Sequence, residues 1–590
     1  MNTFEINETF ELNGKPFKII SGAMHYFRIV PEYWRDRLEK LKAMGCNTVE
    51  TYIAWNVHEE NKGQFVWDGM ADFEKFISIA QELGLYVICR PGPYICSEWE
   101  LGGLPAWLLA EPGMKLRCMY SPYIEYVNRY FGELIPRLVP HQIDHGGNII
   151  LFQVENEYGY YGNNKLYLKY LANLMRSLGV TVPFVTSDGP WGNAFKCGQI
   201  EEALPTANFG SAAKIQFDLI KKQMPKKKPM MCMEFWAGWF DAWGNRKHKT
   251  SPLKINKLDF DYLVKKHNVN IYMFHGGTNF GFMNGSNYYK KLTPDTTSYD
   301  YDAPLSEDGL ITPKYRAFKE IIEKYQEVPA VQFSTPIKRI AYGVLNAESS
   351  VGLWQNLDKI SSGMEYEYPV SMEETGQNYG YILYRTKLSD WEKTFDIEIE
   401  QASDRVQVYS EGSHLYTLYD KETTKKVFAS IKGNSNLDFL VENMGRVNFA
   451  HYLEEQKKGI QKGVKINGHR KFGWQIFNLP LDKNQFAKID SLLDENKGQK
   501  TKINKEEPSF TKFTFDIEET GDTFLDFTGW GKGCAFVNGF NIGRFWDKGP
   551  QKRLYIPGPL LHKGQNSIVI FETEGKRKNT IELKDEHKLQ

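Results

Sequence analysis

The chain has 590 residues, and its 73 Lys and Arg balance 73 Asp and Glu to give a formal net charge of zero. A balanced chain lacks the basic excess of proteins that bind nucleic acids or anionic membranes. The hydrophobic fraction of 41% is ordinary for a chain with a large core, and no apolar run approaches the ~20 residues of a membrane span.

Apolar, strand-like runs alternate with segments of helical periodicity from residue 17 to about residue 325. The first helix, for example, is expected to begin near Pro31 and to end before Gly45. Continuous apolar strands that alternate with helices are typical of a parallel sheet covered on both faces. The eight predicted strands lie near residues 17–24, 47–54, 85–90, 148–155, 180–185, 206–209, 229–234 and 268–274. This pattern predicts an α/β fold with a (β/α)8 TIM barrel over residues 1–328, and an open doubly wound sheet is the alternative.

After about residue 330, short alternating runs and turn signals predict two all-β sandwich domains of jelly-roll type. Asn538-Gly539, for example, is a strong signal for a two-residue hairpin turn. The polar, Lys-rich stretch 496–508 is interpreted as a linker, which gives domains over 329–495 and 496–590 unless the two are interleaved. Trp530 and Trp546 would mark a sugar site if they are exposed, and the alternative is that the last domain only braces the barrel.

The seven cysteines include no CxxC pair and no Cys/His spacing typical of a metal site. The N-terminal segment MNTFEINETF lacks the apolar run of a secretory signal, so we expect reduced cysteines and a cytoplasmic location. No HExxH, GxSxG, GxGxxG or P-loop motif occurs, so we expect no metal and no cofactor.

Carboxylates end two of the predicted strands. Functional side chains of a parallel barrel gather at the C-terminal ends of the strands, where strand 4 carries Glu155 and Glu157 and strand 7 carries Glu234. Strands 4 and 7 face each other across the barrel mouth. Hydrolysis of a glycosidic bond needs one carboxylic acid to protonate the leaving oxygen and a second carboxylate to attack or stabilise the anomeric carbon. The pattern therefore favours a glycosidase, but Glu155 and Glu157 share strand parity and are not separated by it.

Three tryptophans follow the end of strand 7. Trp236, Trp239 and Trp243 are spaced so that one or more could form a platform for the leaving sugar, and core packing against the β domains is the alternative. Two other functions stay open on the pattern alone. One is a barrel glycosidase for another sugar, such as a β-glucoside, and the other is a catalytically inert carbohydrate-binding protein.

Seven collinear segments of the barrel resemble glycoside hydrolase family 35, the β-galactosidases. They are ISGAMHYFR, ETYIAWNVHE, RPGPYICSEWELGGLPAWLL, QVENEYGYYG, MEFWAGWFDAWG, YMFHGGTNFGFMNG and TSYDYDAPLSEDG, and the similarity resumes in GWGKGCAFVNGFNIGRFWDKGPQKRLYIP near the C-terminus. The resemblance implies a (β/α)8 barrel followed by β-sandwich domains. In length the chain looks like the compact intracellular bacterial members, which tend to prefer β-1,3-linked galactose.

The resemblance also implies an exo-acting, retaining β-galactosidase that removes terminal non-reducing galactose. The acid/base would be Glu157 and the nucleophile Glu234, whose negative charge should raise the pKa of Glu157. The implied galactose contacts are Tyr52, Cys96, Glu98, Asn156, Tyr272 and Tyr301.

Two positions depart from some relatives. Ser97 replaces a common Ala beside the implied galactose contacts, and Trp236 stands where animal members carry Tyr. The expected partner is an oligosaccharide with a terminal β-galactose, together with a second copy of the chain if a homodimer forms.

Overall fold

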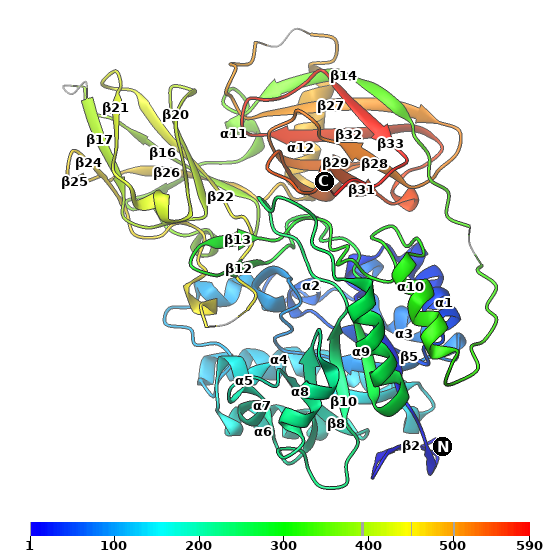
Figure 1. The fold of residues 1–590 in the computed structure, drawn as a ribbon. Coiled ribbons are helices and arrows are strands. Elements are labelled where there is room, and N and C mark those ends of the chain that lie inside the picture. Colours follow the sequence, from blue (N-terminus) through cyan, green and yellow to red (C-terminus); the bar gives the residue numbers. More distant parts are fainter. Residues whose placement is uncertain (1, 335, 391–393, 450, 500–501, 590) are drawn as a thin grey trace.

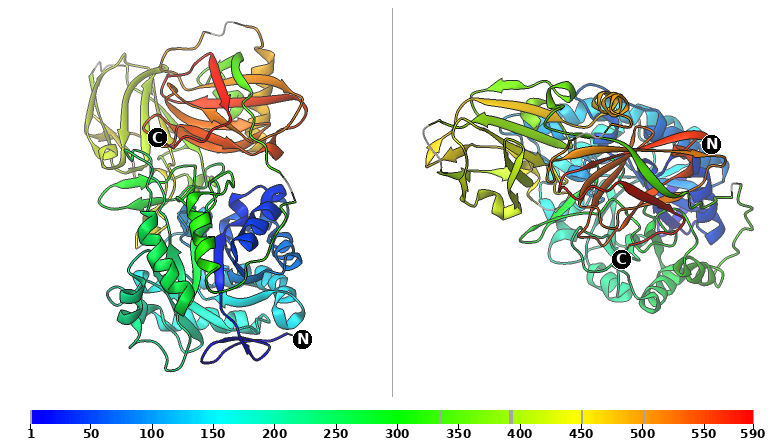
Figure 2. Two further views of the ribbon diagram at one scale, coloured as in Figure 1. Left: turned by 45° about the vertical axis from the view of Figure 1, so that its right-hand side comes forward. Right: turned by 90° about the horizontal axis from the view of Figure 1, so that it is seen from above.

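The computed structural model describes residues 2–334, 336–390, 394–449, 451–499 and 502–589. A barrel domain carries the N-terminal hairpin at one end and two all-β units at the other (Figures 1 and 2). Within the described ranges, no helix combines the length and the apolar character that a membrane span requires.

Eight parallel strands close into a barrel, which confirms the predicted fold class. They are β4 (Ile20–Met24), β5 (Thr48–Tyr52), β6 (Tyr86–Arg90), β7 (Ile149–Gln153), β8 (Phe184–Asp188), β9 (Ala203–Phe209), β10 (Met231–Trp236) and β11 (Asn268–His275). The fifth strand begins later than the predicted 180–185, because the backbone N–H groups of Thr181 and Val182 bond to the Gln142 side chain instead of a neighbouring strand. The barrel is closed by pairing of β11 with β4.

Helices pack around the barrel with their apolar faces inward. The longer ones are α1 (Trp34–Met44), α3 (Phe73–Glu82), α4 (Ser121–Leu138), α6 (Lys165–Ser177), α8 (Ala213–Ile220), α9 (Leu253–Lys266) and α10 (Pro313–Ile322). The first shows the predicted signals: Pro31 opens the short 3-10 turn before it, and Gly45 ends it at φ 105°, a left-handed conformation that favours glycine. Short helices α2 (Trp55–His58), α5 (Tyr158–Tyr161) and α7 (Ala194–Gly198) lie in the loops that follow strands.

Two small sheets extend the barrel domain. The hairpin strands β1 (Phe4–Ile6), β2 (Phe10–Leu12) and β3 (Lys15–Pro16) form a separate sheet near the N-terminus. Strands β12 (Ser286–Tyr288) and β13 (Leu292–Pro294) form a hairpin in the loop after β11, toward the all-β units (Figure 1).

The C-terminal unit is built on an eight-stranded sheet. One of its strands, β14 (Gly343–Gly352), lies more than 150 residues before the others in the chain. In sheet order its strands are β30 (Phe540–Trp546), β29 (Lys532–Val537), β32 (Gly564–Glu572), β27 (Ser509–Ile517), β14 (Gly343–Gly352), β33 (Thr580–Lys584), β28 (Thr523–Asp526) and β31 (Arg553–Ile556). The two-residue turn between β29 and β30 is Asn538-Gly539, with φ 48° and 84°, as its sequence signal predicted. Helix α12 (Lys483–Glu495) packs on β14 and β27.

The first all-β unit lies in the chain between β14 and α12. Its strands are β15 (Met364–Tyr366), β16 (Tyr381–Lys387), β17 (Thr394–Ile399), β18 (Ala402–Ser403), β19 (Arg405–Ser410), β20 (Ser413–Tyr419), β21 (Val427–Ser430), β22 (Asn436–Glu442), β23 (Gly459–Ile460), β24 (Val464–Ile466), β25 (His469–Arg470) and β26 (Trp474–Leu479), and α11 (Leu357–Ile360) precedes them. The predicted boundaries at 329–495 and 496–590 do not follow this division, because β14 pairs with β27 and β33 across the inserted unit. Residues 500 and 501 of the predicted linker lie outside the described residues.

The C-terminal unit does not expose the two tryptophans that would mark a sugar site. Trp530 is 1% exposed and packs with Phe513, Phe527 and Phe545 in the core of the sheet. Trp546 is 5% exposed and lies against Tyr419 of the first all-β unit. Both therefore serve packing.

A buried ion-pair group joins the barrel to the first all-β unit. Arg446, which follows β22, pairs with Glu100 from the barrel loop after β6 and with Glu373 of its own unit, and all three side chains are fully buried. The Arg446 guanidinium also donates to the carbonyl of Asn378. Buried charges are tolerated only when they are paired and hydrogen-bonded, so this contact fixes how the unit sits on the barrel.

Arg446→Met should lower the free energy of unfolding by about 3–5 kcal/mol, because Glu100 and Glu373 would stay buried without their counter-charge. Urea unfolding followed by tryptophan fluorescence measures the change. As a control, Arg35→Met removes an exposed pair with Glu82 and should cost less than about 1 kcal/mol. Equal losses in the two variants would contradict the prediction.

Candidate active site

A cavity of about 260 Å³ opens at the C-terminal end of the barrel. Every predicted site residue except Trp243 lines it. The lining residues are Tyr52, Cys96, Ser97, Glu98, Asn156, Glu157, Tyr160, Trp191, Glu234, Trp236, Trp239, Phe240, Tyr272, Asn287, Tyr289, Tyr301 and Phe449. The predicted residues that line the cavity come from the ends of five barrel strands and the loops that follow them, as the strand-end rule predicts.

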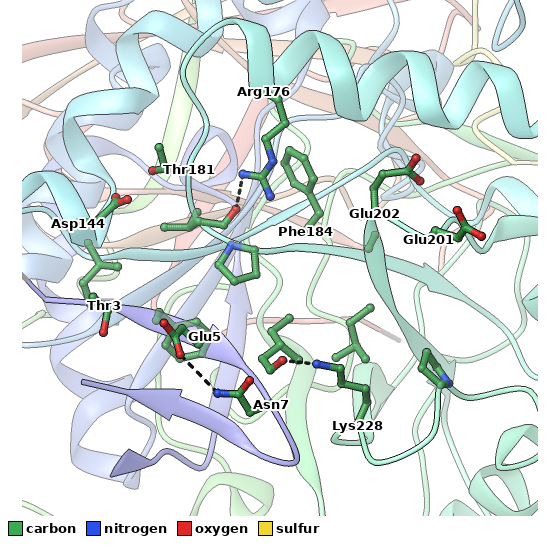
Figure 3. Close-up of a pocket in the computed structure, with 18 residues that line it drawn as sticks. Thr3, Glu5, Asn7, Asp144, Arg176, Thr181, Phe184, Glu201, Glu202 and Lys228 are labelled. Atoms are coloured by element: carbon green, nitrogen blue, oxygen red, sulfur yellow. Dashed lines mark hydrogen bonds between the residues drawn. The ribbon is translucent and has the colours of Figure 1, made fainter. Parts of the chain in front are cut away.

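A larger cavity, about 650 Å³, lies at the opposite end of the barrel beside the N-terminal hairpin (Figure 3). Its cations are already engaged. The Arg176 guanidinium stacks on Phe184 and donates to the carbonyls of Val180 and Val182, and Lys228 donates to the carbonyl of Ile6. Among the described residues that line it, no pair of buried carboxylates converges, so this cavity lacks the arrangement that glycoside hydrolysis needs.

The structure separates the two glutamates that strand parity left together. Strand β7 ends at Gln153, and both Glu155 and Glu157 then adopt left-handed backbone conformations, with φ 58° and 45°. Glu155 turns away from the cavity and accepts two hydrogen bonds from the Arg117 guanidinium, at 2.8 and 2.7 Å. Glu157 lines the cavity, so it is the glutamate of this segment that can meet a substrate.

The Glu234 carboxylate is held by three donors. Its Oε1 accepts from Arg90 at 2.6 Å and from the Tyr52 hydroxyl at 3.0 Å, and its Oε2 accepts from the Trp236 indole at 3.0 Å. Arg90 and Tyr52 also donate to Oδ1 of Asn156. Donors that face both oxygens stabilise the ionised carboxylate and fix its orientation in the cavity.

Burial and like charge act together on Glu157. Desolvation, and then the negative charge of Glu234, raise the pKa of Glu157 to about 8, while a hydrogen bond from Asn208 and the charge of Arg90 oppose the rise. The charge of Glu234 acts in the predicted direction, but burial is the larger cause. Burial is also the first cause that raises the pKa values of Glu50 and Glu98 to about 7.

The turn that carries Glu98 is strained and tightly held. Cys96, Ser97 and Glu98 are three consecutive left-handed residues without a glycine, at φ 58°, 60° and 47°. The Arg28 guanidinium donates to the hydroxyl and the carbonyl of Ser97 and stacks over Tyr299 at 3.9 Å. The Tyr299 hydroxyl donates to the Glu98 carboxylate. The serine that departs from some relatives therefore supplies an extra acceptor for the arginine that holds this turn.

Aromatic side chains form one wall of the cavity. Trp236 stacks on Trp191 with ring centroids 6.0 Å apart, and Trp239 meets Trp236 edge-on at 5.5 Å. Phe449, from the first all-β unit, packs edge-on against Tyr160. Flat apolar faces of this kind suit the face of a sugar ring.

Trp243 does not join this wall, and its predicted role as a sugar contact is wrong. Its side chain is 8% exposed and packs with Met444 and Trp546, between the barrel and the two all-β units. Its backbone N–H bonds to the carbonyl of Pro294, which holds the chain away from the cavity. The alternative of core packing against the β domains describes it correctly.

Several lining residues were not predicted. Trp191 follows β8, so the strand-end rule would have found it had the fifth strand been placed at 184–188. Phe449 comes from another domain, and nothing near it in the sequence signals a site. Tyr289, which is 62% exposed, begins the turn between β12 and β13, a hairpin too short to carry a pattern.

Comparisons with known proteins agree with this geometry. Residues 9–325 match the family described as Glycosyl hydrolases family 35. Residues 369–480 match the first all-beta domain of beta-galactosidase, and residues 508–566 match its galactose-binding domain.

Full-length relatives cover nearly the whole chain. Human Beta-galactosidase-1-like protein 2 is 39% identical over 571 residues, which are 95% of this chain and 88% of the relative. Rice Beta-galactosidase 8 is 37% identical over 96% of this chain and 91% of its own length, and mouse Beta-galactosidase is 37% identical over 97% and 92%. These three relatives are eukaryotic, so they lend no support to the predicted resemblance to bacterial members. The family match and these identities together establish that the chain belongs to glycosyl hydrolases family 35 and is a glycoside hydrolase.

Proposed function

We propose that the chain is an exo-acting β-galactosidase that hydrolyses terminal β-D-galactose with retention of configuration. The observation that carries the proposal is the pairing of Glu157 and Glu234 in one cavity, where burial and the Glu234 charge keep a proton on Glu157. Retaining glycosidases use two such carboxyl groups, one as acid/base and one as nucleophile. The beta-galactosidase names of the relatives support galactose as the sugar.

In the first step, Glu234 attacks the anomeric carbon while Glu157 gives its proton to the leaving sugar oxygen. Arg90, Tyr52 and Trp236 hold the attacking carboxylate in place. Once the glycosyl ester has formed, the negative charge of Glu234 is gone and the pKa of Glu157 falls. Glu157 then acts as a base that activates water, and hydrolysis returns a free carboxylate and a galactose of retained configuration.

The galactose ring would sit between the strained turn and the opposite strand ends. Glu98 would bind two sugar hydroxyls, Asn156 would bond the 2-hydroxyl, and Cys96, Tyr272 and Tyr301 would complete the contacts; each of these residues lines the cavity. Its volume of about 260 Å³ is below the ~300–1,000 Å³ of typical ligand pockets, which favours one terminal sugar over the middle of a chain.

We propose a preference for β-1,3-linked galactose, with the leaving sugar against the aromatic wall of Trp191, Trp236 and Trp239. We also propose a cytoplasmic location. All seven cysteines are unpaired, five of them buried, which is usual in a reducing compartment.

Glu234→Gln should reduce kcat by at least about 10³-fold on a nitrophenyl β-galactoside, because the amide cannot form the glycosyl ester. In the unaltered protein, proton NMR of the first-formed galactose should show the β-anomer. Glu111→Gln, a change at an exposed surface pair, is the control and should keep full activity. An initial α-anomer, or near-normal turnover by Glu234→Gln, would refute the covalent mechanism.

The activity kcat/KM should fall as the pH rises through about 8, because the pKa of Glu157 is raised to about 8 and the acid must carry a proton in the free enzyme. The raised pKa keeps Glu157 protonated, and therefore able to act as the acid, up to a higher pH than an ordinary glutamate. A pH profile on a β-1,3-linked galactosyl disaccharide measures it. A fall centred near the ordinary pKa of a glutamate would contradict the assignment.

Trp239→Ala should lower kcat/KM on a β-1,3-linked galactosyl disaccharide by about tenfold and on a nitrophenyl galactoside by less, because a stacked aromatic contact is worth roughly 0.5–1.5 kcal/mol beyond its buried area. The ratio of activity on β-1,3 and β-1,4 disaccharides should fall with it. Trp243→Ala is the matched control, since Trp243 lies outside the cavity, and it should leave the ratio unchanged. If Trp239→Ala and Trp243→Ala showed the same ratio of activity on the two disaccharides, the proposed binding of the leaving sugar to Trp239 would be refuted.

A further inference from the structure

Two buried side chains on neighbouring strands lead to Glu157. Asn208 on β9 donates from Nδ2 to Oε1 of Glu157 at 3.1 Å, and the Ser187 hydroxyl on β8 donates to Oδ1 of the same asparagine. Ser187 is 1% exposed and Asn208 is fully buried. Neither residue lines the cavity, so neither can touch the substrate.

The order of these hydrogen bonds fixes which face of the amide meets Glu157. Because the Ser187 hydroxyl occupies Oδ1, the amide presents its NH₂ group to the carboxyl group. An NH₂ group can only donate, so Oε1 of Glu157 must accept. A protonated Glu157 therefore carries its proton on the other oxygen, Oε2.

Ser187 also holds the backbone of the same residue. Its carbonyl accepts the N–H of Glu157 at 3.0 Å, and the next residue, Asp188, accepts the N–H of Gly159 at 2.7 Å. Glu157 has a left-handed backbone at φ 45°, a conformation that a non-glycine residue keeps only when its surroundings hold it there. The end of β8 thus positions the main chain of Glu157 directly, and it positions the Glu157 side chain through Asn208 on β9.

We propose that Ser187 and Asn208 are positioning residues, which keep Oε1 of Glu157 as an acceptor and its acid proton on Oε2 for the leaving sugar oxygen. This inference rests on the proposed role of Glu157 as acid/base. It adds a requirement that the role alone does not contain, namely that the proton sits on one oxygen of the two.

Other charged and titratable groups also surround Glu157, and they stay in place when Asn208 is changed. They come from β6, β8, β10, α5 and the neighbouring loops, and are Arg90, Asp188, Glu234, Tyr160, Tyr94, Cys96, Glu98 and Tyr289. Loss of the Asn208 donor removes one group that favours the ionised carboxylate, so the pKa of Glu157 should rise further.

The test uses Asn208→Leu, which keeps the approximate size of the side chain and removes the donor. We expect the alkaline limb of kcat/KM to move up by about one pH unit, as befits a hydrogen bond to a charged group. We expect kcat on a β-1,3-linked galactosyl disaccharide to fall by about 10–100-fold, because its leaving oxygen needs a well-placed proton. On a nitrophenyl galactoside, whose leaving group needs little protonation, the loss should be much smaller.

Ser187→Ala is the second variant and loses only one oxygen. Without the Ser187 hydroxyl the amide can rotate and present Oδ1 to the protonated acid, so the alkaline limb should move in the same direction by a smaller amount. Thr206→Val is the matched control. It removes a buried hydroxyl from β9, the strand of Asn208, and this hydroxyl donates to the carbonyl of Thr186 and not to Glu157. Its profile should coincide with that of the unaltered protein.

The inference is overturned if the folded variants keep the alkaline limb of the unaltered protein, or if they lose activity equally on both substrates. If Asn208→Leu does not fold, Ser187→Ala alone decides. Glu157→Ala separates this failure from failure of the proposed function. It should lose disaccharide activity and regain turnover of the nitrophenyl galactoside with azide, and a Glu157→Ala variant that still cleaves the disaccharide would refute the proposed acid/base, whatever Asn208 does.

Discussion

The active end of the barrel depends on the burial of several carboxyl groups beside one guanidinium. Arg90 is fully buried, bonds Glu234 at 2.6 Å and lies 3.6 Å from Glu50. Glu157 is buried and Glu98 is half-buried in the same region, and in the described part of the chain neither makes such a contact to Arg90. Arg90, together with Arg28 beside Glu98, offsets only part of these carboxylate charges, so burial still raises the pKa values of Glu50 and Glu98 to about 7 and that of Glu157 to about 8. Glu234 accepts hydrogen bonds from Arg90, Tyr52 and Trp236, whereas the raised pKa of Glu157 favours its protonated form.

The strained loops that carry these groups are held from outside the barrel. The C-terminal unit reaches the segment before Tyr299 and Tyr301. The Thr297 hydroxyl exchanges hydrogen bonds with the backbone of Arg544, and the Gln551 side chain accepts the N–H of Ser298. On the other side, Arg446 of the first all-β unit donates a hydrogen bond to Glu100, in the loop that follows Glu98. Left-handed residues cost about 1–3 kcal/mol each, and these contacts keep them in place. The all-β units thus stabilise the loops of the site, and Phe449 of the first unit also lines the cavity.

The barrel and most of its site could be predicted because the signals are local. An apolar run marks each strand, and the residues that follow the run share one rim, which was enough to gather Glu157, Glu234 and Glu98. What failed depends on distant partners. The fifth strand begins later than predicted because Gln142 binds the backbone just before it. The two β domains are interleaved, the arrangement that the sequence left open, because β14 pairs with strands more than 150 residues away. Arg117 draws Glu155 away from the cavity, and Trp243 packs against Met444 and Trp546 of the two all-β units.

In the proposed mechanism Glu157 would act first as an acid and then as a base, and its surroundings fit both steps. Burial raises its pKa throughout the cycle, whereas the charge of Glu234 raises it only until the ester forms. The Asn208 donor and Arg90 lower it at every stage. When the Glu234 charge is lost, the groups that favour the ionised form remain, and of the three influences that oppose it only burial and the charge of Glu98 are left. In the proposed mechanism, Asn208 and Arg90 are the groups that would help Glu157 to lose its proton at the second step. A fixed donor on one oxygen and a removable charge nearby are therefore both needed for a single carboxyl group to serve the two steps.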